Sequence, residues 1–308
     1  MTRTAGPRLL VEAGSLSHAM WYLRWPLDPA VYVGLAALTV GYLWLARSHG
    51  ANWRRLVFFY LGVLTIWVAL ETPLHTLGDS YLQSAHMTQH MLLISFAPPF
   101  LLLSLTPEMA RRLAAVPGVR AVTEPVPALL LYSVGIIFWH IPPVFDATAT
   151  VDALHVAEHL TFLLIGLLFW WPLITATSAA ARWKLGDPQK LVFLFFGMLP
   201  MMAIALPLQF ATYPLYAHYV TAPRINAFLT PVVDQTIAGA LMMFLDMVVL
   251  ATDGLVVFFR WIHREVEGDY RRAPLGATGS GASERESDQD AEDEAALDAY
   301  LRSEPGSR

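Results

Sequence analysis

The sequence predicts an all-α fold, a polytopic membrane protein built as a seven-transmembrane-helix bundle, and three observations lead to this class. First, 56% of the 308 residues are hydrophobic and only 15% are charged, which is too apolar for an ordinary soluble domain. Second, apolar runs of about 20 residues, long enough to cross a bilayer as a helix, recur along the chain. Third, positive charge alternates between the connecting loops. The runs lie at residues 30–46, 53–72, 85–105, 126–142, 154–175, 189–211 and 233–260.

Each run is expected to form one crossing, and three runs carry residues that are unusual inside a membrane. The third contains Pro98–Pro99, and the sixth contains Pro200 and Pro207. Proline in a helix interior should kink the helix and free carbonyl groups that neighbouring helices must satisfy. The seventh run carries Asp246 near its middle, and an ionisable group at this depth is a functional candidate.

The loop charges predict an orientation, because short loops rich in Lys and Arg stay in the cytoplasm. The first, third, fifth and last connections are basic, whereas the second and fourth hold no Lys or Arg. We therefore expect an outer N-terminal segment at residues 1–27 without a cleaved signal peptide, a membrane domain at 28–262, and an inside C-terminus. Residues 263–308 carry 12 acidic residues against six Arg, which predicts a disordered cytoplasmic tail.

The absence of cysteine narrows the chemistry of the chain. Disulfides, thiolate metal sites and iron–sulfur clusters are excluded together, so a bound metal must be held by His, Met, Asp or Glu. In the expected orientation most histidines lie on the outer side, and this asymmetry is the main functional clue. Eight of the ten are on that side: His18, His75, His86, His90, His140, His155, His159 and His218.

Two histidine pairs are spaced to share one metal ion. His86 and His90 lie at the start of the third run, and His155 and His159 lie at the start of the fifth. Residues i and i+4 project from one face of a helix about 6 Å apart, so each pair can bind one ion or line one cavity.

Four further residues extend this expected metal site. His140 ends the fourth run at the same depth, and His75 lies in the outer connection before the third run. Met87 and Met91 follow the first pair, rotated from it by about 100°. Imidazole together with thioether is a ligand set suited to copper, especially Cu(I), with zinc as the alternative metal.

The same residues allow two other interpretations. HVAEH at residues 155–159 matches the H-x-x-E-H pattern of zinc proteases, with Glu158 as general base, although Gln89 stands where the first pair would need a glutamate. A haem held by one histidine from each of two facing helices is the other alternative. The outer acids either orient imidazole N–H groups and attract a cation or are ordinary surface residues: Glu71, Asp79, Asp146, Asp152, Glu158 and Asp234.

The resemblance to a known family rests on four blocks: SAHMTQHMLLISFAPPFLLLSLTP, WHIPPVFDATATVDALHVAEHLTFLLIGLLFWWPL, YPLYAHY and VVDQTIAG. Over residues 28–262 the chain resembles the cytochrome c oxidase assembly factor CtaG of the caa(3)-oxidase type, a seven-helix membrane family. The resemblance implies a role in maturing a haem–copper oxidase by supplying or holding copper. The family motifs match this chain at the residues that the resemblance implies are functional, which are His86, His90, His140, His155, His159, Asp234 and Gln235. The chain departs from the family pattern at Ala238, where a second glycine is expected before Gly239.

Taken together, the sequence predicts a non-enzymatic assembly factor of the prokaryotic plasma membrane that binds copper on the outer side and supplies it to the metal centres of the oxidase. The expected partners are cytochrome c oxidase subunits and the lipid bilayer, and no nucleic acid. The expected ligands are His75, His86, His90, His140, His155 and His159 with Met87 and Met91, and the expected supporting residues are Glu158, Asp234 and Gln235.

Overall fold

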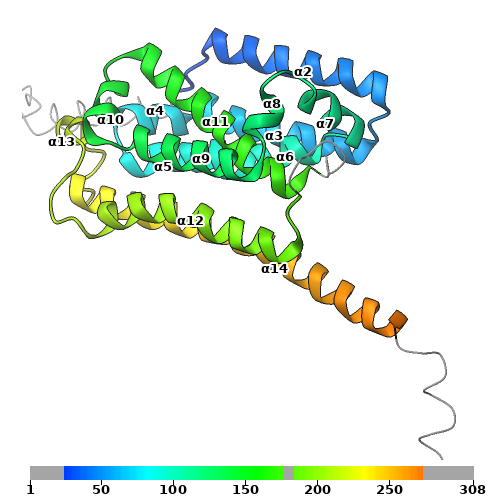
Figure 1. Ribbon diagram of the computed structural model, residues 1–308. Coiled ribbons are helices and arrows are strands. Elements are labelled where there is room, and N and C mark those ends of the chain that lie inside the picture. Colours follow the sequence, from blue (N-terminus) through cyan, green and yellow to red (C-terminus); the bar gives the residue numbers. More distant parts are fainter. Residues whose placement is uncertain (1–23, 176–183, 273–308) are drawn as a thin grey trace, which may run out of the picture. The chain divides into compact units, whose positions relative to one another are not determined.

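The computed structural model describes residues 24–175 and 184–272, and within these residues every regular element is a helix (Figure 1). The predicted fold class, an all-α polytopic membrane protein, is confirmed. The chain divides into two units, Met1–Val257 and Phe258–Arg308. The first unit contains the candidate site, and the described part of the second is the end of the last helix.

Five helices are long and apolar enough to cross a membrane on their own. Each coincides with a predicted run, and the last extends beyond residue 260 into a charged segment. These helices are α2 (Pro29–His49), α3 (Trp53–Glu71), α11 (Asp152–Ile174), α12 (Asp187–Phe210) and α14 (Pro231–Arg272).

Two bent pairs account for the remaining runs and bring the number of spans to seven if each pair is one span. In the first, the stretch Gln83–Leu103 turns by 116° into α7 (Pro107–Ala114). In the second, α9 (Pro125–Trp139) turns by 76° into α10 (Pro142–Thr148). The bend lies at His140 and Ile141, and Pro142 disfavours a helical conformation of Ile141 before it. The first stretch consists of α5 (Gln83–Met91), the π-helical turn η2 (Leu92–Phe96) and α6 (Ala97–Leu103), and the short connecting helices are α4 (Pro73–Ser80), α8 (Val119–Val122) and α13 (Ala217–Thr221).

The π-helical turn η2 lies where the predicted proline pair interrupts the third crossing. Pro98 has no N–H, so it cannot donate the ordinary helix hydrogen bond to the carbonyl of Ile94. Trp170 of α11 donates to this carbonyl instead, at 3.2 Å. Gly166 makes the approach possible, since a Cβ there would lie 2.7 Å from the Ile94 carbonyl oxygen. The expectation that a neighbouring helix satisfies the freed carbonyl is confirmed here.

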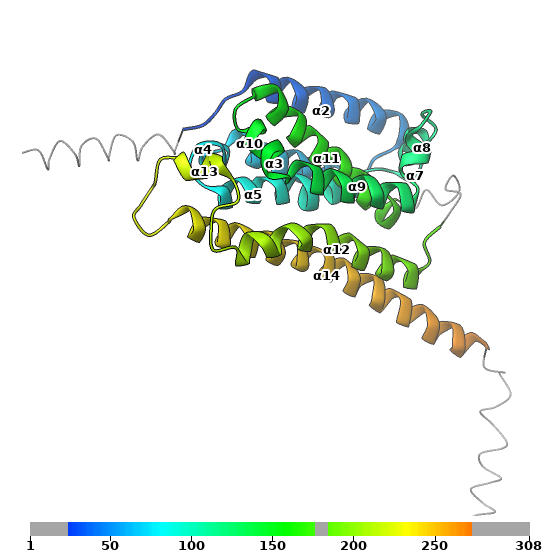
Figure 2. The ribbon, with the colours of Figure 1, turned by 60° about the vertical axis from the view of Figure 1, so that its left-hand side comes forward.

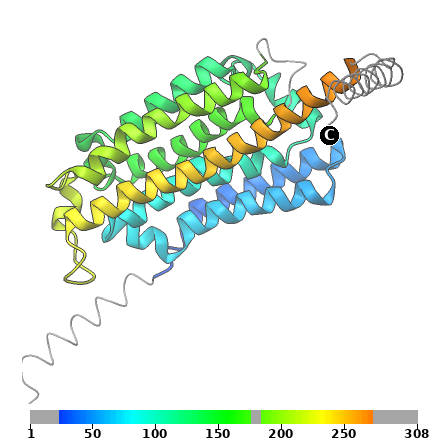
Figure 3. The same cartoon turned by 90° about the horizontal axis from the view of Figure 1, so that it is seen from below.

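Within the first unit the helices form a bundle with distinct sides. Helix α2 lies on one side, and α12 and the first part of α14 run side by side on the opposite side (Figures 1 and 2). The view from below shows α12 and α14 alongside each other over most of their shared length (Figure 3). They pack closely, because a Cβ at Gly239 of α14 would lie 2.6 Å from the carbonyl oxygen of Ala205 in α12. The remaining long segments, α3, α5–α6, α9 and α11, form the centre of the bundle, and α5 and α11 carry the two histidine pairs.

Candidate metal centre

Helix α5, which carries the first histidine pair, is held at its start by a carboxylate from α14. Asp234 is buried and accepts the backbone N–H of Gln83 at 2.6 Å and that of Ser84 at 3.3 Å. The Ser84 hydroxyl donates to the same carboxylate at 2.5 Å. The N-cap residue of α5 is Leu82, whose apolar side chain cannot accept the first helix N–H groups. Asp234, 150 residues away in sequence, caps the helix in its place. Asp234 therefore fixes the helix that presents His86 and His90.

Gln235, the neighbour of Asp234, supports a different segment. Its side-chain oxygen accepts the N–H of Leu215 at 2.7 Å, and its amide donates to the carbonyl of Tyr213 at 3.2 Å. It thus holds the chain between α12 and α13. In both residues the side chain contacts backbone and supports the segments around the histidines.

The two predicted pairs face each other across the interface of α5 and α11. The ring centroids of His86 and His90 are 4.2 Å apart, and those of His155 and His159 are 4.3 Å apart. Between the pairs, His86 lies 5.7 Å from His155, and His90 lies 5.7 Å from His159. His86, His90 and His159 are buried, with 4%, 1% and 7% of their surface exposed. Four imidazoles from two spans therefore occupy one pocket.

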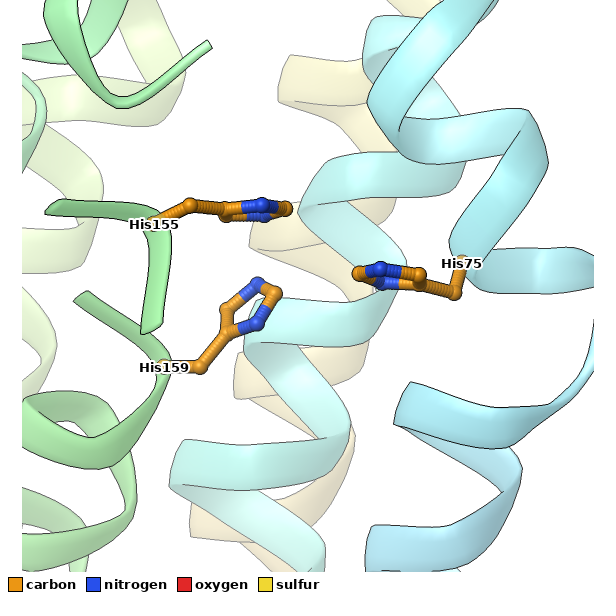
Figure 4. A group of neighbouring side chains, drawn as sticks. All are labelled: His75, His155 and His159. Carbon is orange, nitrogen blue, oxygen red and sulfur yellow. The ribbon is translucent and has the colours of Figure 1, made fainter. Parts of the chain in front are cut away.

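His75 and His140 flank this group on different sides. His75 comes from α4, and its ring lies 5.4 Å from that of His155 and 5.9 Å from that of His159. Figure 4 shows these three rings turned toward one another, two from α11 and one from α4. His140 follows the last residue of α9, and its ring lies 5.7 Å from that of His90. The structure therefore brings all six predicted histidine ligands into one cluster.

Glu158 lies in the middle of the cluster and is completely buried. Its oxygens are 3.9 Å from His86 Nε2 and 3.7 Å from His90 Nε2. Neither oxygen has a hydrogen-bond partner among the described residues. The structure therefore places this carboxylate next to the imidazoles themselves.

Three groups of side chains present ligand atoms that lie within 4.8 Å of one another. The first is His75, His155 and His159, the second is His86, His90 and His159, and the third is His86, His155 and Glu158. None of the groups found in the described part of the chain includes His140. The donor sets consist of imidazole nitrogens with at most one carboxylate, which are ligands suited to copper or zinc rather than magnesium or calcium.

Most imidazole nitrogens in the cluster have no partner within residues 24–175 and 184–272. Both nitrogens of His86 and of His90 are buried without a hydrogen bond, as are the Nε2 atoms of His140, His155 and His159. A buried polar atom without a partner costs about 1–3 kcal/mol, so a group of them in one place calls for a ligand.

His140 is fixed in the tautomer that binds a metal. Its Nδ1 lies 2.8 Å from the carbonyl oxygen of Ile136. A carbonyl only accepts, so Nδ1 carries the proton and Nε2 keeps its lone pair. Such a backbone contact is the usual way in which a protein orients an imidazole ligand.

His75 is held differently, by a residue whose role the sequence did not reveal. The Gln89 amide nitrogen lies 2.8 Å from the Ala69 carbonyl oxygen and 2.9 Å from His75 Nδ1. Because the carbonyl needs a donor, this nitrogen donates to both, and the lone pair of His75 Nδ1 is engaged. Burial lowers the pKa of His75, and the nearby His155 lowers it further, so the ring is neutral.

Met87 and Met91 are completely buried in the hydrophobic core. Each follows a histidine of the first pair, and one helix step turns its direction by about 100° from that histidine. Their predicted role as auxiliary ligands stays a prediction.

The other outer acids mostly hold backbone in place. Glu71 is buried, and both of its oxygens accept the N–H of Asp28 at 3.1 Å. Asp146 accepts the N–H of Ala217 at 3.2 Å and that of His218 at 3.0 Å, at the start of α13. His218 itself donates to the carbonyl of Asp79 at 2.8 Å, and His18 lies outside the described residues.

A cavity of about 450 Å³ leads to one side of the cluster. Three acids and three histidines line it together with apolar side chains. The six are Asp28, Asp79, Asp152, His75, His155 and His159. Asp79 approaches the cluster most closely, with its Oδ1 3.6 Å from His155 Nδ1. The histidines of α5 do not line the cavity.

Fold and site together define an integral membrane protein of the polytopic α-helical class with a cluster of buried imidazoles between its spans. The chain belongs to the cytochrome c oxidase caa3 assembly factor family (Caa3_CtaG), whose model matches residues 37–264. No curated protein and no solved structure gives a significant match. The family match confirms the resemblance inferred from the histidine blocks, and all eleven predicted site residues lie inside it. The protein is thus a cytochrome c oxidase assembly factor that lies in a membrane.

Proposed function

We propose that the histidine cluster binds copper as Cu(I) and supplies it to the metal centres of a cytochrome c oxidase during assembly. Copper is the cargo of the protein in this proposal, and no bond of a substrate is made or broken. The proposal requires a site that binds a soft ion and that the ion can leave again.

The observation that carries the proposal is the convergence of six imidazoles in one pocket, with seven of their nitrogens buried and free of hydrogen bonds in the described residues. A histidine packed for structural reasons satisfies its polar atoms, as His218 does with a backbone carbonyl. Neutral imidazoles are soft enough for Cu(I), and their number exceeds what one ion needs.

The charge inside the pocket favours a monovalent ion. Among the described residues, Glu158 is the one carboxylate in the three groups of converging ligand atoms, and Asp79 approaches only on the cavity side, 3.6 Å from His155. One carboxylate balances one positive charge, so Cu(I) leaves the site neutral whereas a divalent ion leaves an excess charge in a low-dielectric setting. An unbalanced buried charge is costly, which supports Cu(I) over zinc.

We place the protein in the plasma membrane of a prokaryote, and the distribution of basic residues supports an outer location of the cluster. Asp28, before the first residue of α2, lines the cavity beside the cluster, whereas Arg47 lies near the last residue of α2. A helix of this length separates its ends by about 30 Å, the thickness of the hydrocarbon core. Because basic loops stay in the cytoplasm, the cluster is assigned to the outer side.

The two alternatives are less well supported by the geometry. A zinc hydrolase needs its general base beside a water and a substrate, but Glu158 is completely buried and does not line the cavity. A haem needs a flat space between its axial ligands, but the histidines pack against one another and against Phe162, whose ring lies 4.4 Å from that of His90.

The proposal is tested by elemental analysis and a visible spectrum of the purified protein in detergent, followed by titration with Cu(I). We expect one Cu(I) per chain and no Soret band. The double variant His86→Ala with His159→Ala should lose this copper while its helix content, measured by circular dichroism, is unchanged.

His49→Ala is the matched control, because His49 lies at the far end of α2 and its ring is bonded to the Leu45 carbonyl. Full copper occupancy in the double variant would show that the ion binds elsewhere. Zinc in place of copper, together with hydrolytic activity lost in Glu158→Gln, would favour the protease interpretation.

To test delivery, copper-loaded protein is mixed with apo-oxidase, and transfer is measured as copper appearing in the oxidase.

A further inference from the structure

We propose that the cluster offers one copper ion two alternative positions and that the ion moves between them by exchanging ligands without leaving the protein. The cavity position is formed by His75, His155 and His159, and the deep position by His86, His90 and His159. This inference deepens the proposed function and rests on it.

The two positions share a ligand, which is the first observation behind the inference. His159 belongs to both groups of converging ligand atoms. A neutral imidazole has a single nitrogen lone pair, so His159 binds one ion at a time. The five histidines of the two positions therefore hold one ion in two places rather than two ions at once.

The two positions differ in how they reach solvent. His75, His155 and His159 line the cavity. Figure 4 shows their three rings turned toward one another. His86 and His90 are buried and do not line the cavity. An ion arriving through the cavity therefore meets the cavity position first, and it reaches the deep position only past His155 and His159.

Three acids are placed to attract the ion to this route. Asp28, Asp79 and Asp152 line the same cavity, and Asp79 lies 3.6 Å from His155 of the cavity position. A cavity with acids and low-dielectric walls raises the local concentration of cations.

The third ligand group provides the intermediate arrangement. It combines His155 of the cavity position with His86 of the deep position, and Glu158 completes it. The ligand exchange then has two steps, each with one bond kept. His86 and Glu158 first replace His75 and His159 while His155 stays bound, and His90 and His159 then replace His155 and Glu158 while His86 stays bound. The oxidation state of copper does not change, no electron is required, and the protein neither gains nor loses a proton overall.

The contacts around each position bias the ion toward the deep one. Binding by His75 costs the hydrogen bond from Gln89, whichever nitrogen is used. If His75 Nδ1 binds the ion, its lone pair no longer accepts the hydrogen bond from Gln89. If His75 Nε2 binds the ion, the Nε2 proton must move to Nδ1, and Nδ1 can then no longer accept from Gln89. His86 and His90 have no such bond to lose, and Glu158 stands 3.9 and 3.7 Å from them. The cavity position is thus built for loading and the deep position for holding.

The inference is tested with Cu(I) as the probe and two bulky anionic chelators that cannot enter the cavity, bicinchoninate as the donor and bathocuproine disulfonate as the competitor. The variants are His75→Gln, which removes the cavity position, and His90→Gln, which removes the deep position. His49→Gln is the matched control. Gln is chosen because it keeps side-chain volume, and each variant is first checked for a single species by gel filtration.

We expect the wild type, His75→Gln and His90→Gln each to bind one Cu(I) per chain. His75→Gln should load Cu(I) about tenfold more slowly than the wild type, and His90→Gln should release Cu(I) to bathocuproine about tenfold faster. A factor of about ten is the lower end of the range by which the loss of one contact weakens a metal site. If His90→Gln does not fold, His86→Gln removes the same position and carries the same expectation.

Several outcomes overturn the inference while leaving the proposed function intact. Two Cu(I) ions per wild-type chain would show that His159 is not shared. Loading of His75→Gln and release from His90→Gln at the wild-type rates would show that the positions are not ordered. A wild type that binds no Cu(I) would instead overturn the proposed function itself.

Discussion

Glu158 and Asp234 are both buried carboxylates near the histidine helix α5, yet they contact different atoms. Asp234 accepts two backbone N–H groups and a hydroxyl at the start of α5. Glu158 accepts no hydrogen bond from the described residues and lies beside His86 and His90. A carboxylate that is saturated by backbone donors stabilises the fold, whereas one that accepts no hydrogen bond and lies beside imidazoles is available to a cation. The comparison distinguishes acids that hold the helices of the site in place from the acid that can neutralise a bound cation.

The largest effect is expected from Asp234→Ala, which removes every capping contact at the start of α5. We expect it to lower the free energy of unfolding by about 2–3 kcal/mol, the sum of a lost helix cap and its charge-assisted hydrogen bonds. Thermal unfolding in detergent measures this change. Copper affinity should fall with it, because α5 carries His86 and His90.

Asp234→Asn is the matched control, since it keeps one acceptor oxygen. It should lose less stability than Asp234→Ala. Wild-type stability in both variants would show that α5 is fixed by its packing alone and would remove the distinction between the two carboxylates.

The second prediction concerns Glu158→Gln, and it has the opposite pattern. Removing a buried charge that has no hydrogen bond should not destabilise the protein. Cu(I) affinity should fall about tenfold, because the ion loses its counter-charge in a low-dielectric pocket. A competitive chelator titration measures the affinity, and thermal unfolding measures the stability. A fall in stability comparable to that of Asp234→Asn, with copper affinity unchanged, would place Glu158 among the structural acids.

The sequence was sufficient to predict the spans and the histidine pairs for physical reasons. A transmembrane helix is encoded by a local run of apolar residues, and the i, i+4 spacing fixes which face His86 and His90 share. The depth of His140 was predicted from its place at the end of the fourth apolar run, and in the structure it directly follows the last residue of α9.

The supporting contacts were not predictable, because they join residues far apart in sequence. The cap that Asp234 supplies to α5 depends on how α14 packs against it, and no local pattern encodes that contact. The hydrogen bond between Gln89 and His75 depends on the close approach of α4 to α5. Gly78 permits this approach, since a Cβ there would lie 2.8 Å from the backbone of His86. Gln89 stood out in the sequence only as the residue that is not the glutamate of a protease motif.

A smaller effect is expected at α13, where Asp146 caps the first turn. Asp146→Asn should lower the free energy of unfolding by about 0.5–1 kcal/mol, because a partly exposed cap is worth less than a buried one. Cu(I) affinity should be unchanged, since Asp146 contacts backbone and none of the clustered imidazoles. The measurements are those used for Asp234. A clear loss of copper affinity would mean that α13, which also places His218 against Asp79, shapes the cavity more than the contacts indicate.

The smallest effect is expected from Gln89→Met, which removes the hydrogen bonds that the Gln89 amide donates to His75 and to the Ala69 carbonyl, with little change in volume. In the His90→Gln background, where only the cavity position remains, Gln89→Met should tighten Cu(I) binding about threefold, in line with the modest net value of one hydrogen bond. In the wild-type background the affinity should barely change, because the deep position dominates. Chelator competition on the single and double variants forms a double-mutant cycle that measures this difference. Equal tightening in both backgrounds would mean that Gln89 acts on the whole cluster through α5, since its backbone lies between those of His86 and His90. A gain confined to the His90→Gln background would show that the residue next to a buried ligand histidine weakens one position selectively, which is the property that a site for temporary binding requires.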